Sequence, residues 1–337
     1  MTIEFESLEA AIANVDGTKH LLAGNGLSMA YDRDIFSYSS LLNTADFSNS
    51  FPIIDDIFKR LETTDFEKVA SSLYFSASVA EAFGENQHAE KINQTIDFLK
   101  KSLIEAVKKN HPSDRNQLSD NRVSNFQLFL RNFLDSKGNL YCLNYDILAY
   151  WGVLRVIDNN RLSVSDGFGT HDDDYVAFHG DSSARKINIL SPHGTLFFFE
   201  DSGNVLKPRS TNNNKMIIDI ISDNLEKGNF PLFVSEGTKE KKYERIRNNH
   251  YLNYCFESIG NCEGSFFIYG HSLDIVSDGH ILEKISSNQN IKKIYASYFG
   301  GETEKSHITT QLLKIKEHSG RKDLEVGIYP ANSVTCW

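Results

Sequence analysis

Residues 18–28 read T-K-H-L-L-A-G-N-G-L-S, and this stretch decides how the rest of the chain is interpreted. Its apolar run predicts a buried strand that ends at two glycines, Gly24 and Gly26. Glycine takes positive φ and lets other groups approach the backbone, so this segment is either a simple tight turn or a cradle for a phosphate. In the second case Asn25 and Ser28 would lie beside the anion.

The turn lacks the full fingerprint of a nicotinamide dehydrogenase. The third glycine of G-x-G-x-x-G is missing, and no acidic residue closes a second strand about 20 residues later. The sequence therefore disfavours an ordinary dehydrogenase. Other segments must decide between a turn and a phosphate site.

The hydrophobic pattern changes near residue 138. Between the strand at 18–23 and this point, apolar residues recur at helical spacing, and beyond it short strands alternate with helical segments. We therefore predict a single domain over residues 1–337, a Rossmann-like, doubly wound parallel α/β sheet with a helical insertion, about 45–135, after its first strand. Helices are expected at 5–15, 53–62, 65–83, 90–109, 124–134 and 303–318, and strands at 18–23, 138–146, 175–178, 187–191, 231–235, 265–272, 291–297 and 324–329.

Polar groups gather where the predicted strands end. Asn144 and Asp146 follow one strand in L-N-Y-D, and His193 follows another in P-H-G. Gly270 and Ser272 follow a third in Y-G-H-S-L-D. Open α/β sheets bind ligands at the carboxyl ends of their strands, so we expect these groups to converge with the first glycine turn.

Each of these groups also has a purely structural interpretation. Asn144 and Asp146 can bind ribose hydroxyls or a carboxamide, or they can cap a helix. His193 can take a proton from a hydroxyl or a water, or it can be a satisfied core histidine. Asp278 is expected to cap the next helix, and the run K-E-K-K at 239–242 is expected to begin one.

The composition excludes several classes of protein. The net charge is −10 with no block of Lys and Arg, so no nucleic-acid partner is expected. No apolar run approaches the about 18 residues of a membrane helix, and the N-terminal residues do not resemble a signal peptide. The four cysteines form no C-x-x-C pair, so neither a zinc module nor a disulfide framework is indicated. We expect a cytoplasmic protein without a metal.

Taken in order, G-N-G-L-S, L-N-Y-D, P-H-G and Y-G-H-S-L-D resemble the motifs of the sirtuin-like superfamily. More narrowly, they look like bacterial sirtuin-like proteins that have N-Y-D in place of the N-I-D of deacetylases. The resemblance spans roughly residues 18–300, and the helical insertion and the C-terminal residues match only loosely.

The resemblance implies NAD as the ligand and a role for each motif. Asn144 would bind the nicotinamide ribose, Asp146 would recognise the carboxamide, and His193 would be the general base. Gly270 and Ser272 would contact phosphate or the adenosine ribose, although the residue between them differs from the family pattern. The residues implied to cradle the NAD phosphates are Gly24, Asn25, Gly26 and Ser28.

Two departures from the deacetylases narrow the implied activity. The two C-x-x-C pairs that bind their structural zinc are missing, and S-M-A-Y-D-R-D-I-F replaces their A-G-I-P-D-F-R segment. The resemblance therefore implies an enzyme of the zinc-less branch, an NAD+ glycohydrolase that releases nicotinamide and ADP-ribose and depletes NAD in antiphage defence.

Such an activity requires an off state. The helical insertion is the expected lid or partner surface, and the resemblance implies a homo-oligomer or a companion sensor protein, with a nucleotide or phage-derived activator. Two alternatives remain open, a module that senses NAD or ADP-ribose without turnover and an ADP-ribosyl transferase. The sequence does not separate NAD from NADP.

Overall fold

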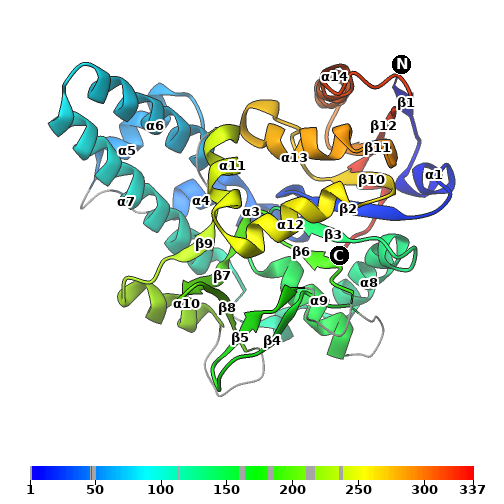
Figure 1. Cartoon of the computed structure of the whole chain (residues 1–337), viewed down its shortest axis with the longest axis horizontal. Helices are drawn as coiled ribbons and strands as arrows, with labels where there is room; N and C mark the ends of the chain where they lie inside the picture. Colours follow the sequence, from blue (N-terminus) through cyan, green and yellow to red (C-terminus); the bar gives the residue numbers. More distant parts are fainter. Residues whose placement is uncertain are drawn as a thin grey trace.

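The computed structural model describes residues 2–45, 47, 51–112, 114–158, 164–180, 186–209, 217–234 and 238–337. At its centre is a seven-stranded sheet in the order β1-β12-β11-β10-β2-β3-β6, in which every pair of neighbours is parallel (Figure 1). The predicted parallel α/β sheet is confirmed. Its strands are β1 (Ile3–Glu4), β2 (Lys19–Ala23), β3 (Leu140–Cys142), β6 (Ile189–Leu190), β10 (Gly264–Tyr269), β11 (Ile291–Tyr298) and β12 (Glu325–Pro330).

The order of the strands reverses at β2. The chain first adds β3 and β6 on one side of β2 and later adds β10, β11 and β12 on the other. Ala23 of β2 lies opposite Tyr269 of β10, so the two strands leave the sheet side by side. A crevice at such a reversal is where open α/β sheets bind ligands.

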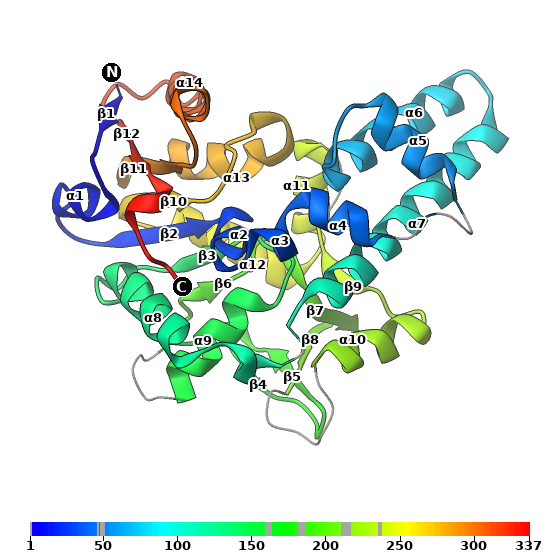
Figure 2. The same ribbon diagram turned by 180° about the vertical axis from the view of Figure 1, so that it is seen from behind.

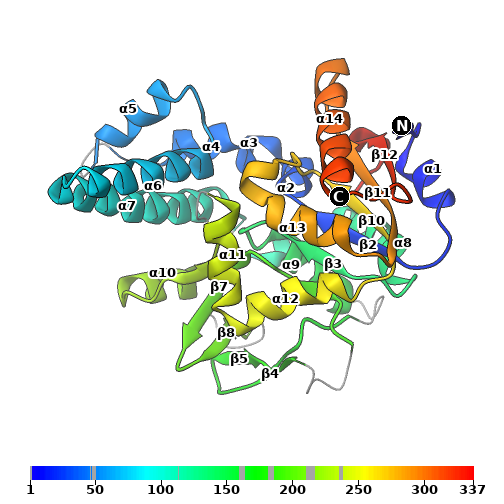
Figure 3. The same ribbon diagram turned by 45° about the horizontal axis from the view of Figure 1, so that its top comes forward.

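Helices cover both faces of the sheet, as a doubly wound fold requires (Figure 3). On one face Phe133 of α8 (Asp120–Leu134) packs on Phe267, with ring centroids 5.6 Å apart, and α9 (Leu148–Asp158) lies next to α8. On the other face Ser258 of α12 (His250–Gly260) contacts the Tyr141 hydroxyl at 3.0 Å. The helices next to α12 are α11 (Lys239–Arg247) and α13 (Ile275–Ser287), and α14 (Glu302–His318) follows α13.

The chain between β2 and β3 is helical, and three of its helices project away from the sheet (Figures 1 and 2). The expected insertion is therefore present, but it follows the second strand, because β1 precedes β2 and pairs with β12 at the edge. A strand of two residues is too short for periodicity to reveal. The helices before β3 are α1 (Leu8–Ala13), α2 (Gly26–Tyr31), α3 (Arg33–Phe36), α4 (Tyr38–Thr44), the projecting α5 (Ile53–Arg60), α6 (Phe66–Ala82) and α7 (Asn86–Asn110), and α8.

A second, antiparallel sheet has the order β4-β5-β8-β7-β9. The strands predicted at 175–178 and 231–235 belong to it, so placing them in the parallel sheet is wrong; Ser235 lies outside the described residues. The cause is a hairpin that the sequence analysis misses, whose turn has φ of 49° at Ser202 and 84° at Gly203. The elements of this region are β4 (Phe168–Thr170), β5 (Tyr175–Phe178), β7 (Gly194–Asp201), β8 (Asn204–Pro208), α10 (Ile217–Glu226) and β9 (Pro231–Phe233). Among the helices of the described residues, none is long and apolar enough to cross a bilayer.

Candidate active site

The glycine turns after β2 and β10 touch through their backbones. Gly26 donates its N–H to the carbonyl oxygen of Gly270 at 2.8 Å. A Cβ on Gly26 would lie 2.4 Å from the Gly270 Cα, and a Cβ on Gly24 would lie 2.7 Å from the Gly270 oxygen. Gly270 also has φ of +66°. This close approach alone explains the three glycines, so they give no separate sign of a phosphate.

The polar residues of these two turns, Asn25, Ser28 and Ser272, have different surroundings. The side-chain amide of Asn25 donates to the carbonyl oxygen of Phe36 at 3.1 Å, which ties the first turn to α3. Ser28 lies in α2 and is fully buried, whereas Ser272 is exposed. Of the predicted cradle, Ser28 is the residue whose side chain meets another predicted site residue.

Ser28, Asn144 and Asp146 form a buried trio. The Ser28 hydroxyl donates to Asp146 Oδ2 at 2.7 Å and accepts from Asn144 Nδ2 at 2.7 Å. Asp146 Oδ1 accepts from the Leu148 N–H at 2.9 Å, so this carboxylate caps α9, as its structural interpretation predicts; its role toward a ligand stays a prediction. Asn144 Oδ1 is buried and has no hydrogen-bond partner among the described residues, which leaves an acceptor for a ligand.

A small cavity borders the trio on the side of the small sheet. It has a volume of about 20 Å³ and is lined by Asn144 and Asp146 together with Ser191 and Thr195. A second cavity, of about 460 Å³, is lined by His179 and by residues of α9 and β4, and it does not reach the trio. The space beside Asn144 is therefore large enough for about one water molecule.

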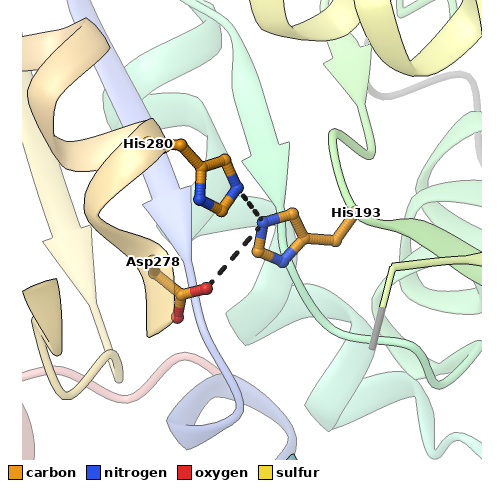
Figure 4. A group of neighbouring side chains, drawn as sticks. All are labelled: His193, Asp278 and His280. Atoms are coloured by element: carbon orange, nitrogen blue, oxygen red, sulfur yellow. Dashed lines mark hydrogen bonds and ion pairs between the residues drawn. The ribbon is translucent and has the colours of Figure 1, made fainter. Parts of the chain in front are cut away.

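His193 lies in the turn between β6 and β7, where Gly194 has φ of +68°. Its Nε2 is 3.0 Å from Nε2 of His280 and 3.9 Å from Oδ1 of Asp278 (Figure 4). The two ring centroids are 5.1 Å apart, so the rings meet edge to edge through these nitrogens. One imidazole must donate and the other accept, which leaves Nδ1 of His193 for a substrate.

Asp278 does not cap α13, and that prediction is wrong. The helix begins at Ile275, and Asp274 is its cap, accepting from the Val276 N–H at 2.9 Å. Asp278 instead lies at a kink of the helix, with φ of −120°. Its carboxylate accepts from Lys242 Nζ at 3.0 Å and lies 3.0 Å from His271 Nε2.

Burial and charge fix the protonation of this cluster. Burial lowers the pKa of His193 well below its usual value and that of His280 to about 3, so both rings are neutral near pH 7. Burial alone would raise the pKa of Asp278, but Lys242 and the hydrogen bond from His271 hold it well below its ordinary value. A neutral His193 therefore lies beside the ionised carboxylate of Asp278.

The same cluster contains the donor set of a possible metal centre. The ligand atoms of His193, Asp278 and His280 all lie within 4.8 Å of one another. However, the two histidine nitrogens point at each other, and Lys242 occupies the Asp278 oxygen that would bind a cation. The geometry therefore favours a hydrogen-bonded network over a coordination sphere.

The predicted convergence at the carboxyl edge of the sheet is confirmed. The four motifs follow β2, β3, β6 and β10. Tyr145 accepts a hydrogen bond at its carbonyl oxygen from the Leu196 N–H at 2.9 Å, which joins the Asn144–Asp146 loop to the strand after His193. The roles given to the individual residues remain predictions.

A family model matches most of the chain. Residues 21–337 match the family described as a domain of unknown function (DUF4917). The chain belongs to this family. A solved structure described as "Structural Basis for the Mechanism and Regulation of Sir2 Enzymes" is similar to this DUF4917 chain over 92% of its length and 94% of the other chain, with 12% identity and a TM-score of 0.34. No curated protein matches the chain.

Three further residues of the site in this DUF4917 chain, Glu67, Lys242 and His280, do not stand out in the sequence. Lys242 falls inside the run predicted to begin a helix, and α11 does begin at Lys239, but its buried pairing leaves no mark in the run. His280 stands two residues after Asp278, and that short D-x-H spacing is a signal that could have found it. Glu67 is 175 positions from Lys242, and no local pattern links them.

Proposed function

We propose that the chain is an NAD+ glycohydrolase. The observation that supports this most strongly is the meeting of four motifs at the reversal of the strand order, with the buried trio of Ser28, Asn144 and Asp146 on one side of β2. A nucleotide bound in the crevice would lie over the turns after β2 and β10. Its nicotinamide ribose would meet Asn144.

In this proposal the trio orients the bond that breaks. The C1′–N bond of NAD+ cleaves through an oxocarbenium-like state, and its electron pair returns to the ring nitrogen, which neutralises the nicotinamide. Asn144 Oδ1, which is free to accept, would hold a ribose hydroxyl, and Asp146 would hold the carboxamide through Oδ2. Holding the reactants in register supplies much of the rate gain.

Water completes the reaction with the help of His193. Water adds to C1′ of the ribosyl cation and loses one proton, and the products are nicotinamide, ADP-ribose and H⁺. A neutral His193 can take that proton through Nδ1 in the tautomer in which its Nε2–H donates to His280. An ionised Asp278 would then stabilise the imidazolium.

We further propose that the activity is regulated and serves bacterial antiphage defence by depleting NAD. The buried state of the trio supports an off state, since Ser28, Asn144 and Asp146 are 0%, 5% and 8% exposed. Activation would then require opening of the site, through self-association, a companion protein or a nucleotide or phage-derived signal.

The test is to measure nicotinamide release by chromatography, alone and with lysate of phage-infected cells. We expect Asn144→Ala to reduce release about 100-fold or more. Asn139→Ala is the matched control, because Asn139 is also buried with an unpartnered Oδ1 but precedes β3 at the opposite edge. Equal release by the two variants contradicts the assignment. Binding without cleavage would point to a sensor, and label transferred from NAD to macromolecules would point to a transferase.

A further inference from the structure

A buried chain of polar contacts begins at the helical insertion. Tyr145, the middle residue of N-Y-D, places its hydroxyl 2.8 Å from Glu67 Oε1 and 2.7 Å from the carbonyl oxygen of Val234. The other carboxylate oxygen of Glu67 accepts from Lys242 Nζ at 2.6 Å. Glu67 lies in the first turn of α6, where the projecting helices meet the body of the protein. It therefore joins the Asn144–Asp146 loop to α11.

The chain continues from Lys242 to the turn after β10. Lys242 Nζ also donates to Asp278 Oδ1 at 3.0 Å, and Asp278 Oδ2 lies 3.0 Å from His271 Nε2. His271 Nδ1 accepts from the Leu273 N–H at 2.9 Å, so the ring proton is on Nε2 and is donated to Asp278. The network thus ends at the residues that follow Gly270.

Leu273 shows that this turn depends on the network. It is fully buried and has φ of 58°, a left-handed conformation that is unfavourable for a bulky side chain. Such a conformation persists only where its surroundings hold it. The bond to His271 is one that holds the Leu273 amide, and His271 is itself held by Asp278.

The charges make the network behave as one unit. Lys242 is 0% exposed, and the side chains of Glu67 and Asp278 are 17% and 14% exposed. A buried cation must stay paired with negative charge. If Glu67 moved away, Lys242 would lose one of its two carboxylate partners, at a cost in free energy. A shift of α6 would therefore reach both turns.

We propose that Glu67 and Lys242 are positioning residues that hold the Asn144–Asp146 loop and the 270–273 turn in the geometry needed for NAD cleavage. The two loops keep these relative positions only while α6 is docked on the body. This inference rests on the proposed function, but the contacts that carry it do not depend on NAD.

The test compares Glu67→Gln, Tyr145→Phe and Arg321→Met in the full chain. Hydrogen exchange is followed at the amides of Leu148, which binds Asp146, and of Leu273, with Phe267 in β10 as the internal reference. We expect Glu67→Gln to speed exchange about tenfold at both amides relative to that reference. Tyr145→Phe removes one hydroxyl, so it should affect Leu148 more than Leu273, and it serves if Glu67→Gln does not fold.

Arg321→Met is the control, because it removes a buried, paired cation at the opposite edge of the sheet. It should leave both amides at the wild-type rate relative to Phe267 while changing global stability. Unchanged exchange at Leu148 and Leu273 in both network variants overturns the proposal, as does faster exchange confined to α6.

Nicotinamide release is measured on the same samples. We expect kcat to fall about tenfold in Glu67→Gln and to stay unchanged in Arg321→Met. If the wild type releases no nicotinamide even with lysate of phage-infected cells, the proposed function fails, and the exchange data still decide whether the network positions the two loops. If the wild type is active and Glu67→Gln matches it, the positioning role is wrong.

Discussion

The strands of the parallel sheet begin along one side of it, here called the amino edge, and end along the other, the carboxyl edge. The buried polar groups at these two edges are satisfied in different ways. At the amino edge, the buried side chains of Arg321 and His20 bind backbone groups. Arg321 donates to the carbonyl oxygens of Ser286 and Asn288 at 3.3 and 2.6 Å. His20 lies between the carbonyl oxygen of Glu263 and the N–H of Asn139, both at 3.1 Å.

At the carboxyl edge, the side chains of the candidate site bind one another. Asn144 meets Ser28 across 116 positions, and His193 meets His280 across 87. A backbone carbonyl is a fixed partner and serves the fold, whereas a side-chain partner can be exchanged for a ligand. We therefore expect ligand binding at the carboxyl edge and a supporting role for the amino edge.

The largest expected effect comes from removing one histidine at each edge. We expect His193→Gln to lower NAD cleavage by about 10²- to 10⁴-fold, the usual contribution of a general base. His20→Gln should keep cleavage and lower only stability, because its partners are backbone groups. Nicotinamide release and urea unfolding of both variants check this. Similar cleavage by the two proteins would remove the functional distinction between the edges.

A buried cation at each edge gives the next effect. Lys242→Met leaves two largely buried carboxylates facing each other, and we expect it to lower the free energy of unfolding by about 3–5 kcal/mol. Arg321→Met should lower it less, because its partner Asp323 is half exposed and stays hydrated. The double variant Glu67→Gln, Lys242→Met should regain part of the loss in urea melts. A larger loss in Arg321→Met would contradict the comparison.

The parts of the fold that could be predicted are those with a local cause. The apolar run before Gly24 predicts a strand that ends at a glycine turn. In an open parallel sheet the polar groups that follow β3, β6 and β10 must then lie at the same edge. The hairpin at Ser202 and Gly203 was also within reach, since a Ser-Gly pair between two apolar runs is a turn signal.

The parts that could not be predicted depend on contacts between distant residues. The pairing of Glu67 with Lys242 needs the projecting helices to be docked in place. The position of Asp278 needs α13 to be capped by Asp274 and not by the aspartate four residues later, and both aspartates are acceptable caps by sequence alone. Local patterns in a single sequence do not show which distant residues meet in the folded protein.

A smaller effect is expected from pH. Burial lowers the pKa of His20 to about 4 and of His280 to about 3, so below pH 6.5 the unfolded chain binds protons that the native protein does not. Stability is therefore lost as pH falls, by about 1.5 kcal/mol for each of these two histidines between pH 6.5 and 5. His193, whose pKa is also lowered by burial, adds in the same direction.

Urea melts at the two pH values check this dependence. His20→Gln should remove the contribution of His20 to the pH dependence of stability and leave the contribution of His280 unchanged. A variant His280→Gln should do the reverse. A stability that does not change between pH 6.5 and 5 would show that these rings are already charged in the native protein.

The smallest single effect is expected at Lys137, which has a left-handed backbone like that of Leu273. Lys137, exposed beside the amino edge, has φ of 64°, and Leu273, fully buried at the carboxyl edge, has φ of 58°. Lys137→Gly removes the unfavourable Cβ contact and should raise the free energy of unfolding by about 1 kcal/mol without changing cleavage. Leu273→Gly removes the same strain but also a buried side chain, so we expect it to lose about 2–5 kcal/mol and to reduce cleavage. If Leu273→Gly were neutral in both measurements, the turn after β10 would be no more than a connection, like the one at Lys137.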